Sequence, residues 1–309
     1  MWWIILSSIL LILIVFLIVM YFQFLNTFKI KKISKTAINM RNAYLKYMDQ
    51  ITQNKEYVNN LLKEKVFIES FDGLRLKADY IKNSKENKIV VFLHGFKSTY
   101  YSDFSSIKYY IDQGYSILAI DQRSHRESEG KYITFGILER RDLLSWINYL
   151  NERFGNCVEI LLIGVSMGAS TIMMASGMGF PSNIKGMICD CGYASPIQEI
   201  SHCIKKYYHL PPKFFVNIFN IYCKIFGKFN LKEATCYEGL ASSNTPILLV
   251  HGDKDDFVPY TCSVINFNNC LSENKELVSI DCSVHAASYL ERPEEYESKI
   301  SQFLLTINF

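Results

Sequence analysis

The hydrophobic positions of this chain form one long run at the N-terminus and a series of short runs beyond it. The long run, WWIILSSILLILIVFLIVMYFQFL at residues 2–25, contains no charged side chain. A helix of this length, at ~1.5 Å per residue, exceeds the ~30 Å hydrocarbon core of a bilayer. The pattern therefore predicts a membrane-spanning helix, and we assign residues 1–28 to a transmembrane anchor.

A cleavable signal peptide is the competing interpretation of this run. No basic segment precedes it, its apolar part is longer than that of a signal peptide, and no small-residue cleavage site follows it, so we favour the anchor. Lysines follow at positions 29, 31, 32 and 35, whereas only the amino terminus precedes the run. By the positive-inside rule, the rest of the chain is expected in the cytoplasm.

Residues 29–65 are predicted to form an amphipathic helix next to the membrane. Neither proline nor glycine occurs between Ile33 and Lys65. Apolar residues recur at spacings of four and three, at positions 33, 37, 40, 44, 47 and 51. Two or three heptads are too few to require a coiled-coil dimer. We expect the stripe to dock on the protein's own body or to lie at the membrane surface, and the oligomeric state stays open.

From Val66 the pattern becomes that of an α/β domain over residues 66–309. Apolar and polar residues alternate around Asp72-Gly73, which predicts a hairpin. Six apolar runs follow, separated mostly by stretches of helical length and pattern: KIVVFLHG, YSILAID, EILLIGVS, IKGMICD, PILLVHG and ELVSIDC. Apolar strands that alternate with helices predict a mostly parallel central sheet with helices on both faces.

One segment, at about residues 194–240, interrupts this alternation. It holds no clear strand and includes the aromatic-rich stretch YYHLPPKFFVNIFNIYCKIFGKF. It is predicted to be a helical cap inserted over the sheet edge where ligands bind in such folds. Most of its aromatic side chains are expected to pack the cap onto the body, and a minority to face substrate.

Composition narrows the classes of function. The 309 residues are 49% hydrophobic and 20% charged, and the net charge of +3 gives no field that would recruit nucleic acid. Nine scattered cysteines, an odd number, fit a reducing compartment better than a disulfide scaffold. Cys189 and Cys191 lack a second Cys/His pair at metal-ligand spacing, so we expect buried thiols there and no metal site.

The stretch LLIGVSMGAS places Ser166 between two glycines, after an apolar strand and before a helical pattern. This strand–turn–helix setting is that of a nucleophile elbow, in which the glycines permit a sharp turn and a close approach of helix and strand. The helix N-terminus favours developing negative charge beside the hydroxyl. Ser166 is therefore the candidate nucleophile.

A serine nucleophile needs a base, and the base needs a carboxylate to orient it. Only two histidines follow Pro246. His251 lies at a strand end, where it is expected to structure the loop, so the candidate base is His285 in CSVHAASY. The loop HGDKDDFVP offers three candidate carboxylates, Asp253, Asp255 and Asp256.

The order of serine, acidic loop and histidine resembles the α/β-hydrolase superfamily. In that family the acidic loop commonly reads H-G-x-x-D-x-x-V, and the match at residues 251–258 assigns the carboxylate to Asp255, with Asp256 in reserve. The resemblance covers roughly residues 66–309. With its single-span anchor and cap, the chain is similar to membrane-anchored bacterial hydrolases of the esterase, lipase and serine aminopeptidase type.

The same resemblance implies an oxyanion hole made of the backbone N–H groups of Phe96 and Met167, each worth on the order of 3 kcal/mol in the transition state. His94 and Gly95 then shape the turn before Phe96. In the loop DQRSHRESEGKYITFG, Arg126 stands where the family often has a small residue. We expect it to pair with one of the nearby glutamates, at 127 or 129, or else to receive an anionic group.

These observations predict a serine hydrolase that cleaves a carboxylic ester or thioester, with an apolar acyl group, and needs no metal or organic cofactor. Its expected partners are an acyl substrate and the membrane, and not nucleic acid. Three alternatives use the same fold: an acyltransferase, a peptidase or amidase, and a non-catalytic binding protein. The last would usually lack a member of the triad, and none is missing here.

Overall fold

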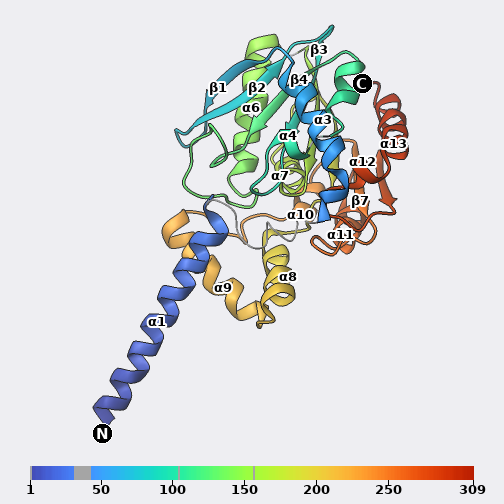
Figure 1. The fold of residues 1–309 in the computed structure, drawn as a ribbon. Helices are drawn as coiled ribbons and strands as arrows, with labels where there is room; N and C mark the ends of the chain where they lie inside the picture. The colour runs from blue at the N-terminus through green and yellow to red at the C-terminus, as the bar shows by residue number, and fades with distance from the viewer. Residues whose placement is uncertain (1, 31–42, 104, 156) are drawn as a thin grey trace.

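The computed structural model describes residues 2–30, 43–103, 105–155 and 157–309. Its centre is an eight-stranded sheet in the order β1-β2-β4-β3-β5-β6-β7-β8 (Figure 1). Strand β2 is antiparallel to both β1 and β4, whereas every other neighbouring pair is parallel. The prediction of a mostly parallel sheet is confirmed.

All the predicted strands are present: β1 (Glu64–Glu69), β2 (Arg75–Ile81), β3 (Lys85–Leu93), β4 (Tyr115–Asp121), β5 (Glu159–Val165), β6 (Ile184–Asp190), β7 (Ile247–Gly252) and β8 (Lys275–Ile280). The first begins two residues before the predicted boundary at Val66. The predicted hairpin joins β1 and β2, where Glu69 pairs with Arg75 and the N–H of Ser70 donates to the carbonyl of Leu74 at 2.8 Å.

Helices cover both faces of the sheet, as its apolar strands require. One core contains buried side chains of α6 (Glu139–Phe154), α7 (Met167–Ser176) and α11 (Thr261–Asn269). The other contains those of α5 (Ile107–Asp112), α13 (Pro293–Thr306) and α3 (Met48–Asn59). The short helices α4 (Tyr100–Asp103) and α12 (Ser288–Glu291) follow β3 and β8.

Helix α1 (Trp2–Phe28) is long and apolar enough to cross a membrane, as signal sequences near the N-terminus also can be. Its two ends differ. Residues 2–15 are all exposed, whereas Phe24 and Phe28 have no exposed surface and belong to the same core as α6 and α7. The N–H of Ile133 donates to the carbonyl of Phe28 at 2.7 Å, so the end of α1 is bonded to the domain.

The segment between α1 and the sheet differs from the helix predicted over 29–65. The stripe positions 33, 37 and 40 lie outside the described residues. The chain then forms a 3₁₀ turn, η1 (Leu45–Tyr47), and α3, which ends before β1. The hydroxyl of Tyr44 donates to the backbone carbonyl of His285, and that of Tyr47 donates to Glu291. The described part of the stripe therefore docks on the protein's own body.

Between β6 and β7, where every residue is described, the chain forms helices and no strand. These are α8 (Pro196–Tyr208), α9 (Pro212–Tyr222), the π-helical turn η2 (Cys223–Gly227) and α10 (Cys236–Leu240). Figure 1 shows α8 and α9 as a hairpin beside α1, on the side of the domain from which α1 extends. We refer to this hairpin together with η2 as the cap.

Candidate active site

Ser166 lies at the turn between β5 and α7, with φ of 54° and ψ of −117°. Non-glycine residues rarely adopt such a positive φ, and it costs of order 1–3 kcal/mol. Both flanking glycines are needed: a Cβ at Gly168 would lie 1.9 Å from the carbonyl oxygen of Leu93, and one at Gly164 would lie 2.4 Å from the backbone of Gly168. The predicted strand–turn–helix geometry is present.

The structure brings Ser166, His285 and Asp255 into one chain of hydrogen bonds. The hydroxyl of Ser166 lies 2.8 Å from Nε2 of His285, and Nδ1 of His285 lies 2.6 Å from Oδ2 of Asp255. The three residues come from the loops after β5, β8 and β7, and they are only 6–7% exposed. This arrangement allows a proton to pass from the hydroxyl to an oriented imidazole.

The three aspartates of the acidic loop after β7 differ in their exposure and in their hydrogen-bond partners. Asp255 accepts the N–H groups of Phe257 and Val258 on Oδ1, at 2.9 and 3.1 Å, which leaves Oδ2 for His285. Asp256 points to solvent with 79% of its side chain exposed, and it pairs with Lys206 of α8. Asp253 is also exposed and accepts the N–H of Cys282 at 3.3 Å.

His251 has the structural role expected of it. Its ring is fully buried, with Nδ1 2.7 Å from the hydroxyl of Ser263 and Nε2 2.9 Å from the carbonyl of Val258. It therefore closes the acidic loop onto α11.

The pKa shifts of His285 and Asp255 are those expected of a base that is paired with an ionised carboxylate. Burial lowers the pKa of His285, but the charge and hydrogen bond of Asp255 outweigh burial, so that the pKa is raised above its usual value. Burial acts in the opposite direction on Asp255, and the neighbouring His285 and His251 hold its pKa well below the usual range. Asp255 therefore stays ionised beside a histidine that is ready to accept a proton.

Phe96 and Met167, the predicted oxyanion donors, lie in loops that leave adjacent strands. Leu93 at the end of β3 pairs with Gly164 in β5, and Met167 opens helix α7. Within the described chain, the N–H groups of these two residues donate to no protein acceptor. Two donors at the ends of neighbouring strands can converge on one developing negative charge.

A residue that the sequence did not point to holds the Phe96 loop. Asp103 on α4 accepts the N–H of Gly95 at 2.6 Å and the hydroxyl of Ser98. It is partly buried, and burial raises the pKa of its carboxyl. The stretch KSTYYSDF around Asp103 carries no motif, so only its position in the fold reveals this role.

Two buried histidines support the same loop. His94 has Nδ1 2.8 Å from the carbonyl of Gly95 and accepts the N–H of Gln122 on Nε2 at 3.2 Å. His125 accepts the N–H of Lys97 at 3.2 Å, and burial lowers its pKa to about 4. His94 shapes the turn as predicted, and His125 adds a support that the sequence did not reveal.

The predicted partners of Arg126 are wrong. Its Nε lies 3.4 Å from Oδ2 of Asp121, which also pairs with buried Lys77. Glu127 pairs instead with Lys65 on β1, and Glu129 accepts the N–H of Arg75 on β2. The neighbouring strands thus supply the partners of both glutamates.

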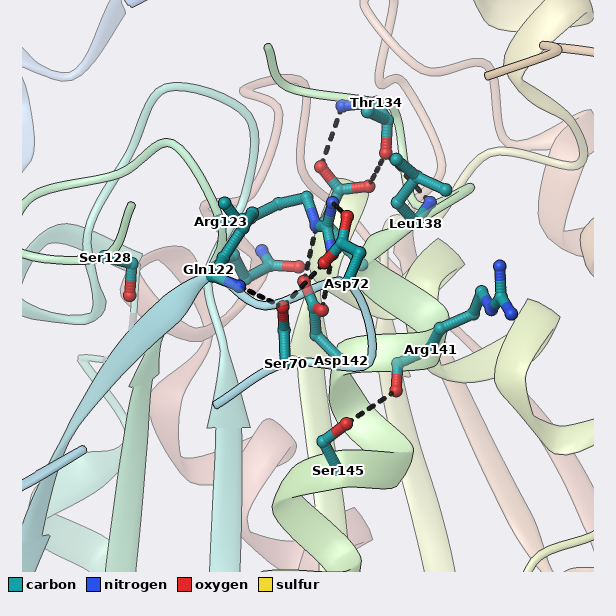
Figure 2. A network of polar contacts seen from close by, with 12 residues as sticks. Ser70, Asp72, Gln122, Arg123, Ser128, Thr134, Leu138, Arg141, Asp142 and Ser145 are labelled. Carbon is teal, nitrogen blue, oxygen red and sulfur yellow. Dashed lines mark hydrogen bonds and ion pairs between the residues drawn. The ribbon is translucent and has the colours of Figure 1, made fainter. Parts of the chain in front are cut away.

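Arg123 links the loop after β4 to the hairpin turn and to α6 (Figure 2). Its guanidinium donates to both carboxylate oxygens of Asp142 on α6 at 2.6 Å and to Asp72 in the hairpin turn at 3.0 and 3.1 Å. Thr134 donates its N–H to Glu139 at 2.8 Å, next to the start of α6. Bidentate arginine pairs of this kind fix geometry, so the network holds the hairpin turn, the loop after β4 and α6 together.

Cys191 lies close to the candidate base. Its Sγ is 4.0 Å from Nε2 of His285, and ligand atoms of Cys191, Asp255 and His285 lie within 4.8 Å of one another, near enough to hold a metal ion. Both ring nitrogens of His285 already take part in hydrogen bonds, however, and burial raises the pKa of the thiol well above its usual value. These groups therefore favour proton transfer over metal binding, and Cys189 and Cys191 are buried thiols as expected.

The cap covers this site. The ring of Phe257 lies 4.9 Å from that of His285, and Tyr207 of α8 lies 6.3 Å beyond Phe257. A cavity of about 310 Å³ lies against α8, lined by Glu199 and His202 together with Pro212 at the start of α9. Oε2 of buried Glu199 has no partner in the described chain, and burial raises its pKa to about 7. The charge of Glu199 also contributes to raising the pKa of His285.

A family profile described as "alpha/beta hydrolase fold" matches residues 88–220, from β3 to α9. The matched segment contains the elbow, and the sheet order and the site geometry agree with it. The chain has the α/β-hydrolase fold. Among the proteins that it resembles, the chain is 22% identical over 253 residues to the "Uncharacterized protein YqkD" of Bacillus subtilis (strain 168), and the match covers 82% of this chain and 83% of YqkD. It is 24% identical over 252 residues to the "Uncharacterized protein YfhR" of Escherichia coli (strain K12), covering 79% and 81% of the two chains.

Solved structures with the same fold include several esterases. The Pyrococcus furiosus esterase Pf2001 superposes with a TM-score of 0.64 and 25% identity over 80% of this chain and 93% of the esterase. Est1E from Butyrivibrio proteoclasticus gives a TM-score of 0.57 and 20% identity, over 79% of this chain and 98% of Est1E. The matched fold and these neighbours support a hydrolase.

Proposed function

We propose that this α/β-hydrolase is a membrane-anchored serine esterase that cleaves a carboxylic ester or thioester with an apolar acyl group. The observation that carries the proposal is the unbroken hydrogen-bond chain from Ser166 through His285 to Asp255, at 2.8 and 2.6 Å. The esterases among the structural neighbours support an ester or thioester as the substrate.

In the first half of the reaction, Oγ of Ser166 attacks the carbonyl carbon while Nε2 of His285 takes the hydroxyl proton. The electron pair of the carbonyl double bond moves to its oxygen, which the N–H groups of Phe96 and Met167 stabilise. Asp255 stabilises the imidazolium. His285 then donates its proton to the leaving alcohol or thiol as the bond to the acyl group breaks, and the acyl group remains on Ser166.

In the second half, a water molecule replaces the alcohol. His285 takes a proton from the water as its oxygen attacks the acyl carbon, and the same two N–H groups stabilise the second oxyanion. The proton then returns to Oγ of Ser166 as the acyl–serine bond breaks. The products are a carboxylic acid and the restored hydroxyl.

The proposed anchor is α1, retained as a single span with the catalytic domain in the cytoplasm. The burial of Phe24 and Phe28 supports retention, because cleavage after the helix would remove two side chains from the core of the domain. The lysines at and after position 29 support the orientation. Protease added outside intact cells should therefore leave the catalytic domain undigested.

Hydrolysis of p-nitrophenyl esters of graded acyl length by the detergent-solubilised full chain tests the activity. We expect Ser166→Ala to lower kcat/KM by about 10⁴-fold or more. Ser176→Ala is the matched control, because Ser176 is also buried on α7 but donates only to the carbonyl of Met173. Equal activity of the wild type and Ser166→Ala would contradict the proposal.

A further inference from the structure

The cap exposes apolar side chains beside α1. Phe214, Ile221 and Ile225 are 56%, 54% and 55% exposed. Large apolar groups gathered on one element mark an interaction surface. With three exposed neighbours they form what we call the cap surface: Tyr208, Leu210, Phe214, Ile221, Ile225 and Phe226.

The charged residues in the stretch of chain that carries the cap surface are of one sign, and one of them, Lys206, pairs with Asp256 of the loop after β7. Residues 200–232 contain lysines at positions 205, 206, 213, 224, 228 and 232 and no aspartate or glutamate. Exposed aromatic and aliphatic side chains together with lysines are typical of elements that lie at an anionic membrane surface. The bordering charges therefore select anionic headgroups.

If α1 spans a bilayer, its contacts with the cap determine how deep the cap lies in that bilayer. A hydrocarbon core of ~30 Å takes up about 20 residues of helix, so a span that starts at Trp2 leaves the core near Tyr21. Phe16 is five residues short of that boundary, or about 7 Å inside the core. Its ring lies 6.3 Å from Phe214 and 6.4 Å from Phe215 at the start of α9.

The contacts towards the C-terminal end of α1 involve tyrosines, which are typical of a membrane boundary. Tyr21 packs on Phe226 with ring centroids 4.9 Å apart, and the hydroxyl of Tyr222 donates to the carbonyl of Leu17 at 2.8 Å. Tyrosine is enriched at this level of membrane proteins because one end of its ring is apolar and the other polar. Figure 1 shows the α8–α9 hairpin projecting from the same side of the domain as α1.

We propose that the cap surface is immersed in the bilayer leaflet next to the catalytic domain, where it admits amphiphilic acyl esters directly from the membrane. The lysines lie at anionic headgroups. The cavity beside α8 is lined in part by Pro212, two residues before Phe214, so the immersed tip borders this cavity. This inference rests on the proposed function, since it requires α1 to be retained as a span.

Fluorescence quenching by bromine-labelled acyl chains measures immersion without any turnover. The full chain, with Trp2 and Trp3 replaced by phenylalanine, is reconstituted into vesicles that contain anionic phosphatidylglycerol. The probe is Phe214→Trp. The matched control is Leu305→Trp, at a 76% exposed position on α13, which lies away from the cap. The remaining Trp146 is buried and is common to both proteins.

We expect brominated lipid to quench at least half of the emission from tryptophan at position 214 and to leave position 305 unchanged. Equal quenching at the two positions would overturn the inference. So would a blue-shifted but unquenched tryptophan at position 214, because protein, such as a second copy of the chain, would then cover the surface. Hydrolysis of a soluble short-chain ester by the same samples reports separately whether the proposed function holds.

A second measurement connects the surface to substrate delivery. Phe214→Glu should lower the ratio of activity on a long-chain ester in vesicles to activity on a soluble short-chain ester by about tenfold, whereas Leu305→Glu should leave this ratio unchanged. An unchanged ratio in Phe214→Glu would show that substrate does not enter through this surface.

Discussion

The triad end of the sheet and the cap surface differ in how their side chains are held. Around Ser166 and His285 the polar atoms are bonded at 2.6–2.8 Å and the residues are at most 7% exposed. On the cap surface, Phe214 and Ile225 are more than half exposed. Contacts within the protein hold the first region in place, whereas the described chain leaves more than half of the Phe214 and Ile225 side chains uncovered.

This difference divides the work of the protein. A preorganised site stabilises the same transition-state charge in any ester that reaches it. In our proposal, the cap controls which esters reach the site. Changes at the triad should therefore lower activity on every substrate, whereas changes on the cap surface should separate soluble substrates from membrane-bound ones.

The largest expected effect is at the base. His285→Ala removes the proton acceptor of Ser166, and kcat/KM should fall on the order of 10⁵-fold for short and long esters alike. The measurement is steady-state hydrolysis of both substrates. A loss confined to the long-chain ester would show that the two regions do not divide the work in this way.

Asp255 and Asp256 offer a comparison within one loop. Asp255→Asn should lower kcat/KM by about 10³- to 10⁴-fold, because the imidazole loses the charge that orients and stabilises it. Asp256→Asn should change it by less than about threefold, since its exposed pair with Lys206 is of the weak kind. Similar losses in the two variants would contradict the assignment of the carboxylate.

The pH dependence of kcat/KM should also reflect the charge of Asp255. Activity requires neutral His285, so kcat/KM should rise with pH through a pKa above the usual histidine value and be lost below it. In Asp255→Asn the main group raising this pKa is gone while burial still lowers it, and the residual activity should extend to lower pH. An acid limb that moves to higher pH would contradict the proposed pairing.

Helix α1 has an exposed N-terminal end and a C-terminal end that is buried in the domain core. This difference allows a stability test. Phe24→Ala should lower the free energy of unfolding by about 3–5 kcal/mol, because it leaves a cavity in the core. Phe22→Ala, two residues away and 55% exposed, should change it by no more than about 0.5 kcal/mol. Denaturant unfolding of the full chain in detergent measures both. Equal effects would mean that α1 is not part of the domain core.

The smallest expected effect is at Tyr44, which we regard as a positioning residue. Tyr44→Phe leaves the carbonyl of His285 without its donor, and kcat should fall about five- to tenfold with little change in KM. Tyr47→Phe is the control, because its hydroxyl binds Glu291 and not the His285 backbone. A loss in KM alone, or equal losses in the two variants, would rule out positioning.

The sequence predicted the parts of the molecule that depend on local pattern. The strands follow from apolar runs, and the elbow follows from two glycines that the backbone cannot do without. Asp255 was chosen among three aspartates by the family pattern, and the physical reason became visible only in the folded loop, where Phe257 and Val258 orient its carboxylate.

Contacts between distant segments could not be predicted. Tyr44 and His285 are 241 residues apart, and nothing near Tyr44 in the sequence indicates its partner. The expected pairs of Arg126 were wrong because the partners of the glutamates, such as Lys65, depend on which strands lie side by side. Hydropathy likewise detects α1 as one apolar run and cannot tell that Phe24 faces protein.

Covalent labelling with a fluorophosphonate tests the central claim most directly, that the chain of hydrogen bonds activates Ser166. The full chain in detergent is labelled and digested, and the modified peptide is identified by mass, for the wild type, Ser166→Ala and Cys191→Ala. We predict one adduct on Ser166 in the wild type and in Cys191→Ala, and none in Ser166→Ala. A folded wild type that stays unlabelled, or an adduct on Cys191 in place of Ser166, would contradict the account.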